Sequence, residues 1–86
     1  MQEVAKAAPT RDEVAEKLRG LIDGHLSREE IAEWASTWVR MRDPLVSDPR
    51  VWNALTEMAG ADLISLDRPY LYDKIDFEVW LNDLFQ

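Results

Sequence analysis

Residues 26–42, LSREEIAEWASTWVRMR, carry the pattern that decides the fold. Five apolar residues in this stretch have the spacing of one helix face: Ile31, Trp34, Ala35, Trp38 and Val39. Ser27 and Glu30, three positions apart, have the pattern of a capping box, which starts a helix at the next residue. We therefore predict a helix over residues 28–41, with its two tryptophans as the buried axis of the protein.

Similar start signals predict three more helices. Each has a residue that can accept a backbone N–H at the first turn, followed by an apolar stripe. These helices and their caps are 11–22 after Thr10, 49–59 after Asp48, and 77–85 after Asp76. Gly24 and Gly60 follow two of the stripes and suit left-handed helix ends. Residues 61–76 have no consistent period, which predicts an irregular connection.

These elements predict an all-α fold, a small four-helix domain over residues 10–86 with a flexible lead-in over residues 1–9. The chain has no cysteine, so stability must come from the apolar core. The inward positions expected of the other helices are Val14, Leu18, Leu21, Ile22, Val51, Leu55, Met58, Ala59, Phe77, Trp80, Leu81, Leu84 and Phe85. We expect Ile75 to pack on Trp80 at the start of the last helix.

The charge is unevenly distributed. Residues 1–42 hold seven Lys/Arg and eight Asp/Glu, a sum of −1, whereas residues 43–86 hold three and nine, a sum of −6. An acidic surface repels nucleic acid and anionic lipid and attracts a basic protein, although acidity that serves only solubility is an equal alternative. No apolar run approaches the ~20 residues of a membrane span, and no signal peptide is evident. We expect a cytoplasmic protein with no membrane partner.

Motifs for catalysis are missing from the sequence. There is no cysteine nucleophile or glycine-rich phosphate loop, and the single histidine, His25, falls in a predicted turn. Asp73 and Asp76 lack the ligand ladder of a calcium loop. We therefore expect no enzyme activity, no cofactor and no metal.

A DNA-binding helix-turn-helix would use the helices at 28–41 and 49–59. The linker over residues 43–48 is acidic and too long for the usual tight turn. Arg50 is the only basic residue near the start of the second of these helices. The sequence therefore predicts no nucleic-acid partner.

The connection over residues 61–76 holds the candidate partner-binding residues. These are Tyr70 and Tyr72 together with the acidic residues Asp62, Asp67 and Asp73. Alternate residues of an extended segment point the same way, and tyrosines amid carboxylates suit contact with Lys or Arg of a protein partner. In the alternative, both rings cover the core and leave only their hydroxyls at the surface.

The segment Thr56-Glu57 followed by Gly60-Ala61-Asp62-Leu63-Ile64 resembles the T-E…G-S-D-L-I run of the colicin E-type nuclease immunity proteins. A second placement, of residues 44–48 on the P-D-G-S-D run of that family, is equally possible. Ser65 and Leu66 stand where the family has paired tyrosines, so no binding residue of the family carries over. The resemblance implies a small, acidic, bacterial four-helix inhibitor of a nuclease toxin.

Two hypotheses about function follow. The first is a non-enzymatic acidic protein that occludes a basic protein partner, most concretely a toxin immunity protein or antitoxin. The alternative is a structural or assembly module that forms a homodimer or larger complex through an apolar helix face. Both a monomer and a homodimer are compatible with the sequence.

Overall fold

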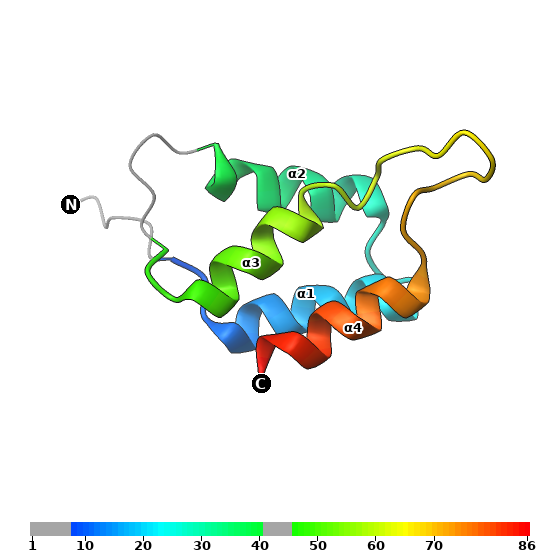
Figure 1. Cartoon of the computed structure of the whole chain (residues 1–86). Coiled ribbons are helices and arrows are strands. Elements are labelled where there is room, and N and C mark those ends of the chain that lie inside the picture. The colour runs from blue at the N-terminus through cyan, green and yellow to red at the C-terminus, as the bar shows by residue number, and fades with distance from the viewer. Residues whose placement is uncertain (1–7, 41–45) are drawn as a thin grey trace.

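The computed structural model describes residues 8–40 and 46–86, and four α-helices account for most of them. In chain order the helices are α1 (Arg11–Asp23), α2 (Arg28–Val39), α3 (Pro49–Met58) and α4 (Lys74–Leu84), as Figure 1 shows. The described ranges contain no strand, and no helix within them is long and apolar enough to cross a membrane. The prediction of a small all-α fold with four helices is confirmed. The predicted end of the second helix near Met41 and most of the lead-in lie outside the described residues.

Side-chain caps set the starts of α1 and α2 as the sequence predicts. The Thr10 hydroxyl accepts the Glu13 N–H at 3.1 Å, and the Glu13 carboxylate accepts the Thr10 N–H at 2.8 Å. Ser27 and Glu30 make the same reciprocal pair, at 3.0 and 2.8 Å. Gly24 ends α1 with φ of 86°, a conformation that costs glycine little.

The start of α4 differs from the prediction by three residues. The helix begins at Lys74, with Asp73 as N-cap, and Asp76 lies inside its first turn, where its carboxylate accepts the Asp73 N–H at 2.9 Å. Ile75 is 71% exposed, so it does not pack on Trp80 as expected. The error arose because aspartate is a good N-cap and both Asp73 and Asp76 are available. A carboxylate at the third helical position can also accept the backbone N–H of the N-cap residue, which is the role of Asp76 here.

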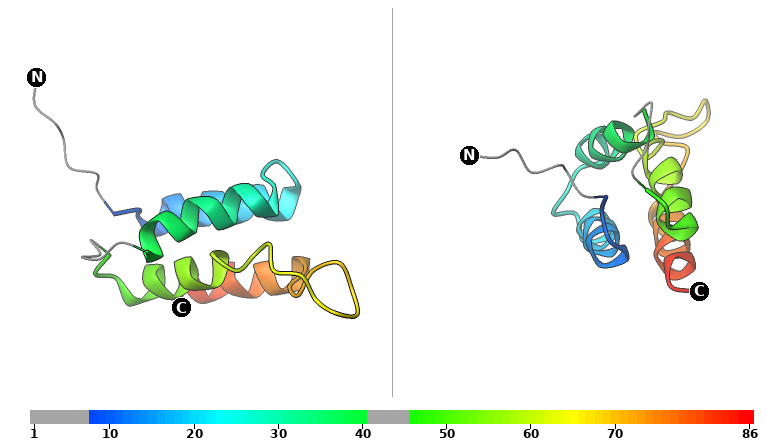
Figure 2. Two further views of the ribbon diagram at one scale, coloured as in Figure 1. Left: turned by 90° about the horizontal axis from the view of Figure 1, so that it is seen from above. Right: turned by 90° about the vertical axis from the view of Figure 1, so that its left-hand side faces the viewer.

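The helices form two layers, each made of a consecutive pair: α1 with α2, and α3 with α4. The end-on view in Figure 2 shows the two layers side by side. The most extensive helix–helix packing runs between the layers, where α1 packs on α4 and α2 packs on α3. The apolar faces of all four helices therefore meet in one core between the layers.

The core cluster contains most of the predicted inward residues together with four alanines. Its fully buried large side chains are Leu18, Ile31, Leu55, Met58, Leu84, Val14 and Val51. Trp38 and Trp80 are also buried, at 5% and 6% exposure. Trp34, by contrast, only packs against the edge of the core, so α2 supplies one buried tryptophan rather than two. Phe85, predicted to be inward, is 49% exposed and follows the end of α4.

The connection between α3 and α4 is irregular, as predicted, and forms a closed loop. The Leu71 N–H donates to the Leu63 carbonyl at 2.9 Å. Leu63, Ile64 and Leu66 are exposed, so these apolar side chains of the connection do not pack into the core. Gly60 does not adopt the left-handed conformation expected of it, because α3 ends at Met58 with Ala59 as a right-handed cap.

Candidate nucleic-acid interface

One face of α3 is turned away from the core and carries polar side chains. Its inward residues are Val51, Ala54, Leu55 and Met58. The helical period then places Arg50, Asn53, Thr56 and Glu57 on the opposite side, and all four are exposed. The Thr56 hydroxyl donates to the Asn53 backbone carbonyl at 2.8 Å, and the Asn53 side chain is exposed. Guanidinium, amide and hydroxyl groups thus follow one another along a single helix face.

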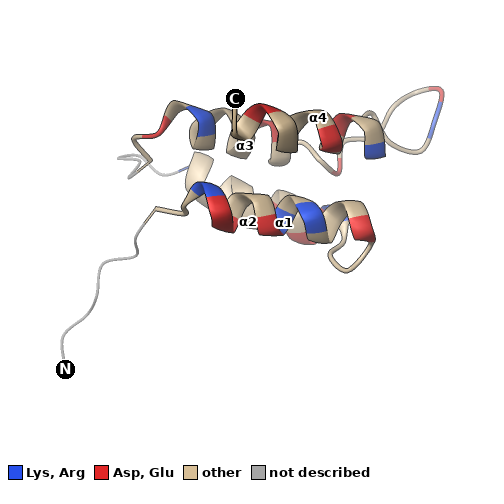
Figure 3. Ribbon diagram, turned by 90° about the horizontal axis from the view of Figure 1, so that it is seen from below, with Lys and Arg blue, Asp and Glu red and all other residues tan. Residues whose placement is uncertain are grey.

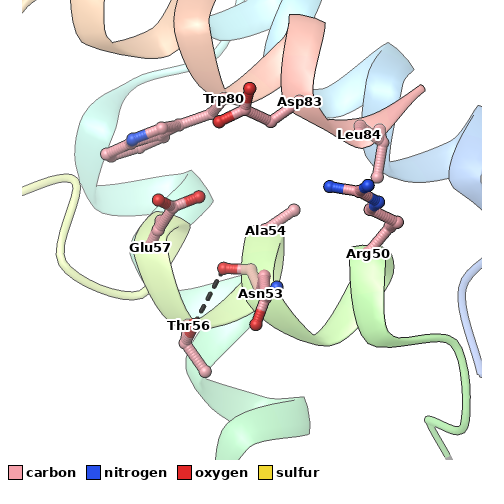
Figure 4. Close-up of a pocket in the computed structure, with 8 residues that line it drawn as sticks. All are labelled: Arg50, Asn53, Ala54, Thr56, Glu57, Trp80, Asp83 and Leu84. Carbon is pink, nitrogen blue, oxygen red and sulfur yellow. Dashed lines mark hydrogen bonds between the residues drawn. The ribbon is translucent and has the colours of Figure 1, made fainter. Parts of the chain in front are cut away.

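These side chains form one wall of a cleft of about 200 Å³ between α3 and α4. Trp80, Asp83 and Leu84 form the α4 wall. Figure 4 shows Arg50 reaching from α3 toward Leu84 at one end, while Glu57 points toward Trp80 and Asp83 at the other. The cleft therefore has a basic end at the start of α3 and an acidic end near its C-terminus.

The acidic end holds two carboxylates, those of Glu57 and Asp83. Partial desolvation raises the pKa of Glu57 above its ordinary value, and the negative charge of Asp83 raises it further. An anionic ligand would meet repulsion here. The start of α3, where Arg50 lies, is the part of this surface that can accept a phosphate or another anion.

The start of α3 is fixed by an ion pair with α1. Asp48, the N-cap, accepts the Arg50 N–H at 3.0 Å and two hydrogen bonds from the Arg11 guanidinium, at 2.7 and 3.1 Å. The hydrogen bonds from Arg11 lower the pKa of the Asp48 carboxyl below its ordinary value. This arrangement orients the first turn of α3 and the base of the Arg50 side chain.

Charges of both signs are distributed over the rest of the surface. Figure 3 shows acidic and basic positions interspersed along α1 and α2, with the basic positions of α3 and α4 near the helix starts. The end of α2 lies at the same end of the molecule as the start of α3 (Figure 1), and Arg40, the C-cap of α2, is exposed.

The predicted partner-binding residues lie at the opposite end of the molecule. Tyr70, Tyr72 and Asp73 line a second pocket, together with Arg28, Arg68 and Pro69. Asp62 is half-buried and Asp67 is exposed, and neither lines this pocket. The Ser65 hydroxyl donates to Asp67 at 2.7 Å and lowers the pKa of its carboxyl. The structure thus brings three of the five residues together.

The position of Tyr72 agrees better with a ring that covers the core than with a ring that contacts a protein partner. Its ring is half-buried and packs edge-to-face on Trp80, with centroids 5.0 Å apart. Tyr70 instead lies against Arg28, whose guanidinium carbon is 4.1 Å from the ring centroid. A role of these residues in binding a protein stays a prediction that the structure does not test.

The fold and the α3 surface define a small all-α protein with a polar face on α3. The chain belongs to the family described as YxzC DNA-binding protein, which it matches over residues 4–84. A curated relative is the uncharacterized protein YxzC of Bacillus subtilis (strain 168), 36% identical over 69 residues. The aligned part covers 80% of this chain and 57% of that relative. No solved structure matches the chain.

Family membership overturns several predictions made from the sequence. The chain does not belong to the colicin immunity family, and the description of its family as DNA-binding conflicts with a toxin-inhibitor function and with a basic protein partner. It also conflicts with the prediction of no nucleic-acid partner, and it does not support the homodimeric assembly alternative. The acidic net charge misled the prediction, because a total charge says little about a local contact surface.

Arg28 and the α3–α4 cleft are the features that the sequence pattern did not reveal. Arg28 lies inside the capping box of α2, and no local signal in the sequence indicates contacts with residues more than thirty positions away. Arg50 was identified as a basic residue at the start of a helix. Its neighbours Asn53 and Thr56 could have been recognised from their helical spacing.

Proposed function

We propose that this protein binds DNA through the N-terminal half of α3, without catalysing a reaction. The observation that carries the proposal is membership of a family described as DNA-binding. The exposed row of Arg50 and Asn53 supports it, because arginine can make bidentate contacts to guanine and asparagine to adenine in the major groove. In helix-turn-helix proteins the N-terminal residues of the recognition helix contact the base edges.

The charge distribution defines which part of α3 approaches the duplex. The start of the helix carries Arg50, whose guanidinium attracts phosphate, while the charge of the N-cap Asp48 is compensated by Arg11. Arg40 lies at the end of α2 on the same side, and the sequence places Arg42 two residues further along. Glu57 and Asp83 repel phosphate at the other end of the cleft. The duplex would therefore contact the start of α3 and stay clear of its C-terminal turn.

The protein would act in the compartment that holds the DNA. In a bacterium such as the source of the relative, this is the cytoplasm. Binding without catalysis agrees with a sequence that lacks cysteine and has one histidine, His25, which is exposed at the end of α1.

Fluorescence anisotropy with a labelled random-sequence 30-base-pair duplex tests the proposal at low salt. Arg50→Ala and Asn53→Ala should each weaken binding, Arg50→Ala by about tenfold or more, because one charged contact to the duplex is lost. Arg19→Ala, which removes an exposed charge from α1 outside the cleft, is the matched control and should bind as the wild type does.

Absence of binding to the duplex pool at low salt would overturn the proposal. So would an equal loss of affinity in Arg19→Ala and Arg50→Ala, because that result would indicate a diffuse charge effect rather than contact through α3. Circular dichroism of each variant confirms that the helices are intact.

A further inference from the structure

The second pocket encloses about 280 Å³ between the start of α2 and the α3–α4 connection. The start of α2 and the α3–α4 connection lie at the opposite end of the molecule from the start of α3, as Figure 1 shows. Its lining combines two arginines with two tyrosines, and the surface proposed to bind DNA does not use it. Two features of Arg28 and one of Arg68 indicate what this pocket can bind.

The Arg28 side chain is held rigidly by its surroundings. Its Nη1 donates hydrogen bonds to the carbonyls of Ala61 and Tyr72. Its guanidinium also lies 4.1 Å from the ring centroid of Tyr70 and 4.9 Å from that of Phe77. A guanidinium fixed in this way loses little conformational freedom when an anion binds to it.

The positive charge of Arg28 has no carboxylate partner among the described residues, where the ion pairs are those of Arg11 and Arg68. Backbone carbonyls occupy only Nη1, so other donors of the planar guanidinium are available to a ligand. A partly buried, uncompensated cation at the edge of a pocket favours an anionic ligand.

Arg68 is the second cation and is held loosely. It donates to the Leu71 carbonyl at 3.0 Å, and its nitrogen is 3.8 Å from the Asp73 carboxylate. Both side chains of this ion pair are more than half exposed, so the pair contributes little to stability. Arg68 can therefore turn toward a ligand without breaking a strong interaction.

We propose that this pocket binds a nucleotide unit, with the phosphate between Arg28 and Arg68 and the base against Tyr70. The aromatic ring supplies a stacking surface and the two guanidinium groups supply charge-assisted hydrogen bonds, which together match a base joined to a phosphate. A volume of 280 Å³ suits one such unit rather than several. The nucleotide is either free or an unpaired nucleotide of a single strand.

Asp73 carries a negative charge at the edge of the same pocket, and its carboxylate repels the phosphate. Removing this charge provides a second test, in which binding should become stronger rather than weaker. Asp73→Asn is suitable because asparagine is as good an N-cap as aspartate and keeps the start of α4 intact.

Isothermal titration with thymidine monophosphate and with a ten-nucleotide oligothymidylate tests the proposal. Arg68→Ala and Tyr70→Ala should each weaken the binding of at least one probe by about tenfold. Asp73→Asn should strengthen it. Arg19→Ala, which removes an exposed charge from α1 and lines neither pocket, is the matched control and should have no effect. Binding of the strand alone identifies single-stranded DNA as the source, and binding of the monophosphate identifies the free nucleotide.

Three results would overturn the proposal: no binding of either probe at millimolar concentration, unchanged affinity in both Arg68→Ala and Tyr70→Ala, or inorganic phosphate binding as tightly as the nucleotide. The inference goes beyond the DNA contact proposed for α3, and duplex binding of Arg50→Ala and Arg68→Ala separates the two. If only the pocket hypothesis is wrong, Arg50→Ala still impairs duplex binding. If only the α3 hypothesis is wrong, the nucleotide probes still respond to Arg68→Ala.

Discussion

Arg11 and Asp48 join the first residue of α1 to the N-cap of α3 across 37 positions of sequence. The same carboxylate accepts the Arg50 N–H, so one side chain both starts α3 and attaches it to α1. This contact connects the two layers at the end of the molecule where we place the DNA surface. Stability and DNA affinity should therefore respond together when it is broken.

The Arg11–Asp48 contact makes stability depend on pH. Because hydrogen bonds from Arg11 lower the pKa of Asp48 in the folded state, the ionised carboxylate stabilises the fold above its unfolded pKa. That contribution is lost as the pH falls through the lowered, folded-state pKa. Urea unfolding across this acid range should show a smaller loss of stability for Asp48→Asn than for the wild type. Equal pH dependence of stability in the wild type and Asp48→Asn would show that the ionised Asp48 carboxylate does not stabilise the fold.

Glu57 should have the opposite effect. Desolvation and the charge of Asp83 raise its folded-state pKa, so the ionised form destabilises the protein. The cost appears as the pH rises from the ordinary glutamate value through the raised pKa. We expect Glu57→Gln to be more stable than the wild type at neutral pH, with the gain absent below the ordinary pKa. Glu16→Gln on the exposed side of α1 serves as the control in the same unfolding series.

The two tryptophans of α2 should differ in their contribution to stability. Trp38 is 5% exposed in the core, and Trp38→Ala should cost about 3–5 kcal/mol in the free energy of unfolding. Trp34 is only half-buried, with the Lys17 ammonium 5.3 Å from its ring centroid, so Trp34→Ala should cost less. Chemical denaturation of both variants measures the difference. Equal costs would mean that the core extends further over α2 than its burial indicates.

Gly20 lies in the last turn of α1, and a Cβ there would be 2.7 Å from Cδ1 of Leu26. Gly20→Ala should therefore destabilise the protein, although alanine favours a helix by about 1 kcal/mol over glycine. In a Leu26→Ala background the same change should become stabilising, because the clash is removed. The double-mutant cycle is measured by thermal unfolding. If Gly20→Ala still destabilised the protein in that background, the clash with Leu26 would not be the cause of the destabilisation.

Salt dependence distinguishes a small DNA contact from a broad electrostatic one. Two or three cations at the start of α3 would give a slope of about −2 to −3 in a plot of log affinity against log salt concentration. Anisotropy titrations at several salt concentrations measure it, and Arg50→Ala should reduce the slope by about one unit. A much steeper slope would require more cations than this end of the molecule carries.

The helices could be predicted from the sequence because their signals are local. Thr10 and Ser27 each act within three residues, and the apolar stripes follow directly from the helical period. The start of α4 was misplaced where two carboxylates, Asp73 and Asp76, compete for the same role. A single sequence does not reveal which of two good caps the tertiary structure selects.

The candidate sites depend on contacts between distant parts of the chain, and these were not predictable. Arg28 contacts the carbonyl of Tyr72, 44 residues away, and only the packing of α2 against the connection brings them together. The charge balance was equally uninformative, since the −6 of the second half includes carboxylates on several elements. Contact with DNA depends on the few charges nearest the duplex.

The hydrogen bond from Leu71 to Leu63 makes the tip of the α3–α4 connection a structurally separate unit. This hydrogen bond joins the two sides of the loop at its base. Arg28 of α2 donates hydrogen bonds to the carbonyls of Ala61 and Tyr72, which lie just outside the loop on either side. Lengthening the tip near Leu66 would therefore leave the helices in place, and each doubling of loop length costs only about 0.6 kcal/mol in closure entropy. This position is the natural place to insert a peptide tag or a reporter domain without disturbing the fold.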